Sequence, residues 1–169
     1  NTYMGSYAAW QNTGSNNIGM GQYALSGSTN SNFNVALGRL AGNTITTGGA
    51  NILIGYCAGN GVLTTGCENI ILGVYAEPSS ASASNEITLG NSSHTVLRTA
   101  ADLMPFTDNA QNIGSASCVW ANIYSGDLHL NNMSQPQGNA VDGTKGNWTL
   151  QEGQNDLFLI NNNTGKKYR

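Results

Sequence analysis

A short motif returns along the first half of the chain: Asn, three mainly apolar residues, Gly, and then Ala three positions later. Its copies begin at Asn1, Asn17, Asn34, Asn51 and Asn69, with a degenerate copy at Asn85 in which Glu86 takes the Asn position. The motif glycines, Gly5, Gly21, Gly38, Gly55, Gly73 and Gly90, are separated by 16, 17, 17, 18 and 17 residues. A fixed period of this length indicates a solenoid, in which one repeat cannot bury its own apolar face.

The content of each repeat favours β-structure over a helical repeat. A unit of this length is too short for a helical hairpin, and Gly and Asn are poor helix formers. The apolar runs are short and rich in aliphatic and β-branched residues, as in strands. Segments such as 26–30 and 46–49 separate them and contain turn-forming residues. The sequence predicts an all-β fold, a parallel β-roll or β-helix with a strand, a corner, a second short stretch and a loop in each repeat.

Each motif position has a predicted physical role. Equivalent residues of stacked repeats lie about 4.8 Å apart, so the recurring Asn can form an amide ladder. We expect the three following residues to face the interior, or a partner, and Gly to turn a corner that a Cβ would obstruct. The Ala fits where the chain folds back, and the tyrosines beside it (Tyr7, Tyr23, Tyr56 and Tyr75) cap the edge of the core. The predicted structural residues are Asn17, Gly21, Asn34, Gly38, Asn51, Gly55, Asn69 and Gly73.

The composition limits the classes of partner. Charged residues make up 9% of the chain, against about 25% in an ordinary soluble domain. The net charge is −3 and there is no basic stripe, so we expect no nucleic acid partner. No apolar run approaches the roughly 18 residues of a membrane span, so we expect no membrane insertion. Apolar residues at 39% argue against a disordered Asn/Gly tract.

The repeats resemble a known family of modules. The stretches NVALGRLAG, NILIGYCAG and NIILGVYA are similar to the NxxxGxxA head repeats of trimeric autotransporter adhesins and to related modules of bacteriophage tail fibres. The resemblance covers residues 1–92. It implies a left-handed parallel β-roll and three chains packed about a common axis.

Residues 93–126 lack the repeat and are predicted to form a connector. Asn112-Ile113-Gly114-Ser115 and Trp120-Ala121-Asn122-Ile123-Tyr124 resemble an element of phage tail fibres and tailspikes, which implies a small β unit within a trimer. The resemblance makes Trp120 and Tyr124 candidate packing anchors. Cys118-Val119 stands where that element usually carries a basic residue just before the Trp, so no charged contact is expected there.

Residues 127–169 are predicted to form a third, small β unit. Strands are expected at 127–130, 148–152 and 157–160, followed by a hairpin through the turn 161–165 into 166–169. The pattern resembles carboxy-terminal segments of marine phage fibre and structural proteins, and Trp148 is its candidate packing anchor. Four of the six basic residues of the chain lie in this unit.

We expect no enzyme activity, no cofactor and no metal. The carboxylates are scattered, whereas glycoside hydrolysis needs a pair about 5 to 9.5 Å apart at a cleft. No nucleophile elbow or phosphate loop occurs. Cys57, Cys67 and Cys118 lack metal-ligand spacing, and we expect buried free thiols, although a Cys57–Cys67 bridge is open if adjacent turns bring them together. His94 is expected to be exposed. His129 is expected to face solvent or form a hydrogen bond, with a site on a threefold axis as the alternative.

The predicted function is that of a structural and adhesion component of a phage tail fibre, located in the virion and extracellular after release. The predicted partners are two further copies in an elongated homotrimer, other virion tail proteins, and a host cell-surface glycan or protein. No receptor contact is assigned: Trp10, Tyr23, Phe33 and Trp148 are candidates, but they serve equally as core or interface anchors. The alternatives are a bacterial trimeric surface adhesin, a polysaccharide-degrading tailspike and an ice-binding solenoid. The last needs a regular Thr array, and we expect the threonines near 44–47 and 64–65 to skip other repeats, which counts against it.

Overall fold

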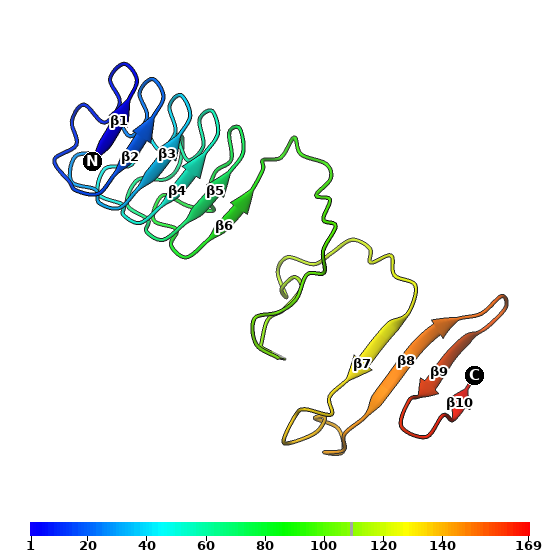
Figure 1. Cartoon of the computed structure of the whole chain (residues 1–169). Helices are drawn as coiled ribbons and strands as arrows, with labels where there is room; N and C mark the ends of the chain where they lie inside the picture. The colour runs from blue at the N-terminus through cyan, green and yellow to red at the C-terminus, as the bar shows by residue number, and fades with distance from the viewer. Residues whose placement is uncertain (109) are drawn as a thin grey trace. The chain divides into compact units, whose positions relative to one another are not determined.

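The first unit of the protein is a parallel β-solenoid. The structure, a computed structural model, describes residues 1–108 and 110–169 and divides them into Asn1–Asp102 and Leu103–Arg169. The first unit contains one three-residue strand per repeat, arranged side by side in sequence order (Figure 1). The strands are β1 (Thr2–Met4), β2 (Ile18–Met20), β3 (Val35–Leu37), β4 (Ile52–Ile54), β5 (Ile70–Leu72) and β6 (Ile87–Leu89).

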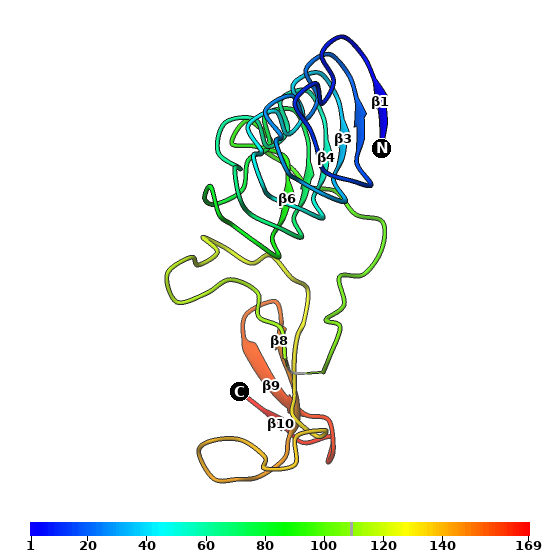
Figure 2. The ribbon, with the colours of Figure 1, turned by 90° about the vertical axis from the view of Figure 1, so that its left-hand side faces the viewer.

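The strands pair in the register of the sequence repeat. Ile18 of β2 lies opposite Val35 of β3, Val35 opposite Ile52 of β4, and Ile52 opposite Ile70 of β5. Each strand residue is therefore flanked on both sides by the residues at the same motif position in the neighbouring repeats. In the view turned by 90°, the successive coils overlap one another (Figure 2). The predicted parallel solenoid is confirmed.

A buried amide ladder runs beside the sheet. The backbone N–H and the Nδ2 of Asn51 both donate to Oδ1 of Asn34, at 2.9 and 3.0 Å, and Nδ2 also donates to the Gly66 carbonyl at 2.9 Å. Asn69 repeats the arrangement on Oδ1 of Asn51, at 3.0 and 2.9 Å. Asn17, Asn34, Asn51 and Asn69 are at most 1% exposed. The predicted ladder is confirmed, and each amide also ties its strand to a loop.

The motif glycines turn the corner after each strand. Gly21, Gly38, Gly55 and Gly73 have φ between 132° and 142°, a region that L-residues rarely adopt. A Cβ on Gly38 would lie 2.3 Å from the carbonyl oxygen of Gly55 in the next coil. Both the backbone angle and the close stacking of coils therefore require glycine, as predicted.

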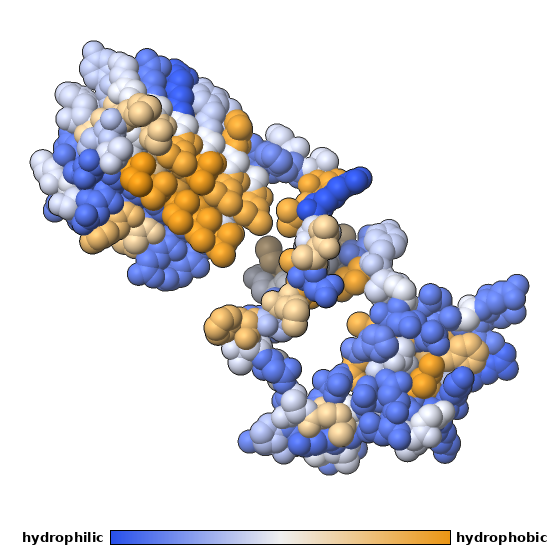
Figure 3. Space-filling view, viewed as in Figure 1, coloured by the Kyte–Doolittle hydropathy of each residue, from blue (hydrophilic) through white to orange (hydrophobic). Residues whose placement is uncertain are grey.

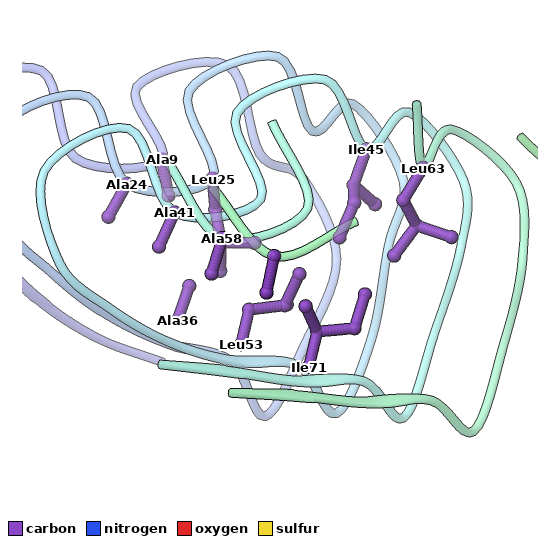
Figure 4. Packing of buried hydrophobic residues seen from close by; sticks show 11 residues of the cluster. Ala9, Ala24, Leu25, Ala36, Ala41, Ile45, Leu53, Ala58, Leu63 and Ile71 are labelled. Atoms are coloured by element: carbon purple, nitrogen blue, oxygen red, sulfur yellow. The ribbon is translucent and has the colours of Figure 1, made fainter. Parts of the chain in front are cut away.

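Only the middle residue of each strand faces the interior, which corrects the expectation that all three apolar residues do so. Side chains alternate between the two faces of a strand, so Ala36, Leu53 and Ile71 point inward while their neighbours point out. The inward residues pack against the motif alanines and against Ile45 and Leu63 from the opposite wall (Figure 4).

Each coil also has left-handed corner positions at residues other than glycine. The residue before the motif Asn has φ near 60° in every repeat: Asn16, Phe33, Ala50, Glu68 and Asn85. A second such position follows the motif Gly by two residues and is occupied by Tyr7, Tyr23, Leu40, Cys57 and Tyr75. Asn and Gly tolerate this conformation, whereas bulky side chains adopt it at a cost.

The second unit contains a four-stranded antiparallel sheet. Its strands β7 (Leu128–Asn131), β8 (Asn147–Glu152), β9 (Leu157–Asn161) and β10 (Lys167–Tyr168) pair in the order β10-β9-β8-β7. The predicted strands and the final hairpin are confirmed. In the connector, residues 93–126 without Asn109, the described residues form one isolated β-bridge, between Ser115 and Cys118. Residues 97–106 form no strand.

The amide ladder predicts that replacing Asn51 by Ala lowers the free energy of unfolding by a large amount. The substitution leaves the Gly66 carbonyl and the two donors of Asn69 buried without their partner. Each such group costs about 1–3 kcal/mol, so we expect the free energy of unfolding, measured by chemical denaturation, to fall by at least about 2 kcal/mol. Asn60→Ala is the control, because no side-chain hydrogen bond is recorded for Asn60; equal losses for both variants would contradict the ladder's role.

The left-handed positions predict a stabilising substitution. Glu68 is exposed with φ near 60° and forms no side-chain hydrogen bond among the described residues. Glu68→Asn places a residue suited to that conformation there, so we expect the free energy of unfolding to rise by about 0.5–1 kcal/mol. Thr65→Asn is an exposed control in the same loop without a positive φ. A similar gain at both positions would show that backbone conformation is not the cause.

Candidate functional site

The outward-facing strand residues form a flat apolar face on the solenoid. The first and third residues of each strand stand in two columns, and we call these columns the apolar face. Near the middle of it, Ile18, Met20, Ile52 and Ile54 are 38 to 41% exposed. The space-filling view shows the patch as a continuous orange area over the strands (Figure 3). The columns are Thr2, Ile18, Val35, Ile52, Ile70 and Ile87, and Met4, Met20, Leu37, Ile54, Leu72 and Leu89.

This face is large for a surface in contact with water. Six rungs at about 4.8 Å give it a length of about 24 Å. Contiguous exposed apolar patches of this kind mark sites of association. Since the face contains no charged side chain and no loop, nothing in it could bind a polar small molecule. It is suited to a second apolar surface.

The C-terminal sheet also has one apolar face. Strand alternation places Leu130, Trp148, Leu150 and Leu159 on the same side, with Trp148 opposite Leu130 and Leu150 opposite Leu159. Leu128, Leu130, Leu157 and Leu159 are all more than 40% exposed. The sheet is a single layer within its unit. Its other face is more polar: Thr149 Oγ1 lies 2.9 Å from Nδ1 of His129 and accepts a hydrogen bond from Asn162 Nδ2.

A shallow pocket of about 460 Å³ opens beside Trp148 on this apolar side. Its polar lining comes from Asn131, Asn132, Asn161 and Lys145. The adjoining loop is ordered by Asp142, which accepts hydrogen bonds from the Thr144 N–H at 2.9 Å and from its hydroxyl at 2.7 Å, and these bonds lower the pKa of the Asp142 carboxyl. Because the pocket shares Leu130 and Trp148 with the apolar side, whatever covers that side also closes the pocket.

Aromatic side chains gather at the corners that follow β1, β2, β4 and β5. The rings of Tyr7 and Tyr23 stack with centroids 5.2 Å apart, and Trp10 meets Tyr7 edge-on at 6.3 Å. Farther along the solenoid, Tyr56 and Tyr75 meet edge-on at 5.1 Å. Trp10 and Tyr7 are 62 and 57% exposed, and the capping of the core edge by these tyrosines stays a prediction.

Arg39 lies between the two aromatic pairs. Its Nε donates to Oε1 of Gln22 at 3.1 Å, and one terminal nitrogen donates to the Tyr56 hydroxyl at 3.1 Å. The guanidinium carbon lies 5.5 Å from the centroid of the Tyr56 ring. In the described chain the recorded ion pair joins Arg169 and Asp156, and Arg39 has no carboxylate partner. The sequence alone does not indicate this arrangement, since Gln22, Arg39 and Tyr56 share one motif position but differ in type.

Of the predicted packing anchors, Trp148 packs within its own unit, whereas Trp120 and Tyr124 are largely exposed. Trp120 and Tyr124 are 63 and 93% exposed, and Phe33 is exposed at a left-handed corner. Trp148 is half-buried against Tyr168, with ring centroids 5.7 Å apart. An anchoring role for Trp120 and Tyr124 between chains therefore stays a prediction.

A column of threonines was missed by the sequence analysis. Thr13, Thr29, Thr46 and Thr64 occupy one position in successive coils, and each hydroxyl donates to the backbone carbonyl of the next coil. This corrects the expectation that threonines skip repeats. The signal was present in the sequence: Thr29, Thr46 and Thr64 each lie five residues before the next motif Asn, and Thr13 lies four residues before it. The hydroxyls are engaged with the backbone, so the column stabilises coil stacking.

The thiols and imidazoles do not form a reactive cluster. All three cysteines are free, as predicted, and the Cys57–Cys67 bridge is not formed. The expectation that the thiols are buried is confirmed for Cys57 and wrong for Cys67, which is half-buried, and for Cys118, which is exposed. His94 is exposed and accepts a hydrogen bond from the Asn91 N–H at 3.1 Å. Within the described residues, no group of three or more His, Cys, Asp or Glu side chains is placed to hold a metal ion.

The acidic residue Glu77 closes a loop of the solenoid. Its carboxylate accepts hydrogen bonds from the N–H groups of Gly61, at 2.7 Å, and Val62, at 3.3 Å. Burial raises the pKa of the Glu77 carboxyl, and these hydrogen bonds offset part of that rise. Glu77 is thus a structural carboxylate that the folded protein holds partly desolvated.

Comparison with known proteins gives no family assignment: no family model, curated protein or solved structure matches the chain. In the described part of the chain, no helix is long and apolar enough to span a membrane.

Glu77 predicts a pH dependence of stability. Its pKa is higher in the folded than in the unfolded state, so its contribution is complete below the ordinary glutamate pKa and is lost as pH rises through the folded-state value. We expect the free energy of unfolding of the wild type, relative to Glu77→Gln, to fall between about pH 4 and pH 7. Chemical denaturation across this range measures it, and a difference that grows with pH would contradict the assignment.

Proposed function

We propose that the chain is a structural and adhesion segment of a phage tail fibre, in which three copies pack through their apolar faces to form a rigid shaft. The observation that carries this proposal is the apolar face of β1 to β6, two columns of outward-facing side chains that are apolar at every position except Thr2 at one end. The resemblance of the repeats to adhesin heads and tail-fibre modules supports both the number of chains and the biological setting.

The chemistry of the face supports association between identical copies. Identical flat faces brought together about an axis place Ile, Val, Leu and Met against one another, with no buried charge to compensate. Strand side chains repeat at about 4.8 Å on every copy, so the ridges of one face can fit the spaces of the next. Burial removes the aliphatic columns from water, which stabilises the assembly by about 25 cal/mol per Å² of apolar surface.

The C-terminal sheet supports the same conclusion independently. A single-layered sheet is stable when something covers its apolar side. Packing of copies through Leu128, Leu130, Leu157 and Leu159 would provide the second layer. The apolar faces of both units thus require a surface that packs against them. Further copies of the same chain supply that surface for both units with the same stoichiometry.

The internal ladder suits a shaft. Each coil is joined to the next by strand pairing, by the Asn amides and by the Thr hydroxyls. These bonds lie in every repeat and resist bending and slipping between coils. A rigid shaft whose surface carries neutral amides and hydroxyls, with few charges, can present an adhesive surface at a fixed distance from the virion.

The native mass of the purified fragment tests the proposal. We expect light scattering to give about 53 kDa, three times the chain mass of 17.7 kDa. Ile54→Glu, which places a charge in the middle of the apolar face, should shift the mass toward that of the monomer, because burying an unpaired carboxylate is costly. Thr47→Glu, an exposed loop substitution, is the matched control and should leave the mass unchanged.

Circular dichroism separates loss of assembly from loss of folding. Ile54→Glu should retain β-structure at a concentration at which its mass has fallen. A wild-type mass of 17.7 kDa, or a trimer unaffected by Ile54→Glu, would contradict packing through the apolar face.

A further inference from the structure

The aromatic corner of the solenoid presents a second surface with a different chemistry. We call it the corner stripe, and it consists of Tyr7, Trp10, Gln22, Tyr23, Arg39, Tyr56 and Tyr75. These residues come after the motif Gly in each coil, whereas the apolar face comes before it. The corner stripe combines ring faces, an amide and a single cation, and it therefore differs from the aliphatic columns used for association.

The aromatic residues of the corner stripe are not explained by the core. The ring of Tyr7 is 57% exposed and that of Tyr75 is 53% exposed, so neither fills the interior. Both occupy left-handed backbone positions, with φ of 57° and 53°, where Asn or Gly would be less strained. Strained residues of this kind point toward function when the fold does not require their side chains.

The cation of the corner stripe is held in place and lacks a counter-ion. Arg39 is the one basic residue of the first ninety-seven positions in the sequence. Hydrogen bonds to Gln22 and Tyr56 fix its guanidinium at the surface, and these two bonds engage only part of its donor set. The described residues supply no carboxylate to it. A planar guanidinium held in this way favours a carboxylate, which it can bind through two parallel hydrogen bonds.

From this combination we propose that the corner stripe binds an acidic glycan, with a sugar ring packed against the exposed Tyr7 and Trp10 side chains and a sugar carboxylate on Arg39. The inference rests on the proposed adhesive function and names its ligand class. An aromatic face is negatively polarised and packs against the slightly positive C–H face of a pyranose. Oε1 of Gln22 accepts from Arg39, which leaves the Gln22 amide nitrogen to donate to a sugar hydroxyl beside the cation.

The periodicity of the solenoid extends this recognition over several sugars. Tyr7, Tyr23, Arg39 and Tyr56 come from four successive coils, which are spaced at about 4.8 Å. A glycan chain lying along the solenoid axis therefore meets a recognition group in each coil. The second aromatic pair, Tyr56 and Tyr75, continues the stripe beyond Arg39.

Titration of the whole fragment with a defined oligosaccharide tests the inference. The probe is tetragalacturonate, and neutral maltotetraose is the comparison ligand. Isothermal titration calorimetry should show saturable binding of the acidic probe, weakened by added salt, and much weaker binding of the neutral one. Equal binding of both ligands, or no binding of tetragalacturonate, would overturn the inference.

Matched variants locate the site. Arg39→Gln should weaken tetragalacturonate binding by about tenfold or more, the effect of losing a charge-assisted pair. Tyr7→Asn removes a ring while suiting the left-handed backbone, so it should weaken binding without loss of stability. Lys145→Gln, in the pocket beside Trp148, is the control. Loss of binding in Lys145→Gln with full binding in Arg39→Gln would place the site in the C-terminal pocket and overturn the inference.

The trimeric shaft and the acidic-glycan site can be refuted independently of each other. A trimer that does not bind tetragalacturonate would refute the acidic-glycan site and leave the shaft unaffected. A monomer that binds tetragalacturonate through Arg39 would refute packing through the apolar face and leave the corner stripe as a glycan site. Circular dichroism and native mass on each variant confirm that altered binding does not follow from altered folding.

Discussion

The solenoid depends on a buried amide that bonds in two directions. Oδ1 of each motif asparagine accepts from the next coil, while Nδ2 donates both to the previous coil and to a loop carbonyl on its own level. One side chain therefore fixes the strand register, the height of each coil and the position of its loop. A carboxylate could not donate, and a hydrophobic residue would leave buried carbonyl and N–H groups unpaired. The glycine corner follows from the same close stacking, because coils drawn together by the ladder leave no space for a Cβ on Gly38.

Strand alternation then determines the surface. A three-residue strand has one inward and two outward side chains, so a run such as Ile52-Leu53-Ile54 fills the core with Leu53 and exposes both isoleucines. Repetition turns this local pattern into a flat aliphatic face. The corner after the strand carries aromatic and polar residues instead, among them Arg39. The same coil thus offers an apolar surface suited to self-association and a polar-aromatic surface suited to a ligand, on opposite sides of the motif glycine.

The repeat was predictable from the sequence because its physical requirements recur at fixed spacing: a buried amide at Asn17, Asn34, Asn51 and Asn69 and a glycine corner four residues after each. The strands of the C-terminal sheet were predictable from alternation and turn residues. The outward direction of Ile52 and Ile54 was not, since three apolar residues in a row carry no period of two. The hydrogen bonds of Arg39 could not be predicted either, because Gln22, Arg39 and Tyr56 occupy one position of the repeat but differ in residue type. The threonine column could have been found from the sequence, because Thr29, Thr46 and Thr64 each lie five residues before the next motif Asn. The hydrogen bonds of their hydroxyls to the next coil become visible only when the coils are stacked.

Hydrogen exchange of the fragment in its native state, followed by nuclear magnetic resonance, tests the ladder most directly. The account predicts that the Nδ2 protons and backbone N–H groups of Asn34, Asn51 and Asn69 exchange together, and only through unfolding of the solenoid. Their opening free energies should then match the free energy of unfolding from denaturation. Exchange of these protons at the rates of exposed loop amides such as those of Asn139 or Asn163 would contradict a buried ladder as the basis of the fold.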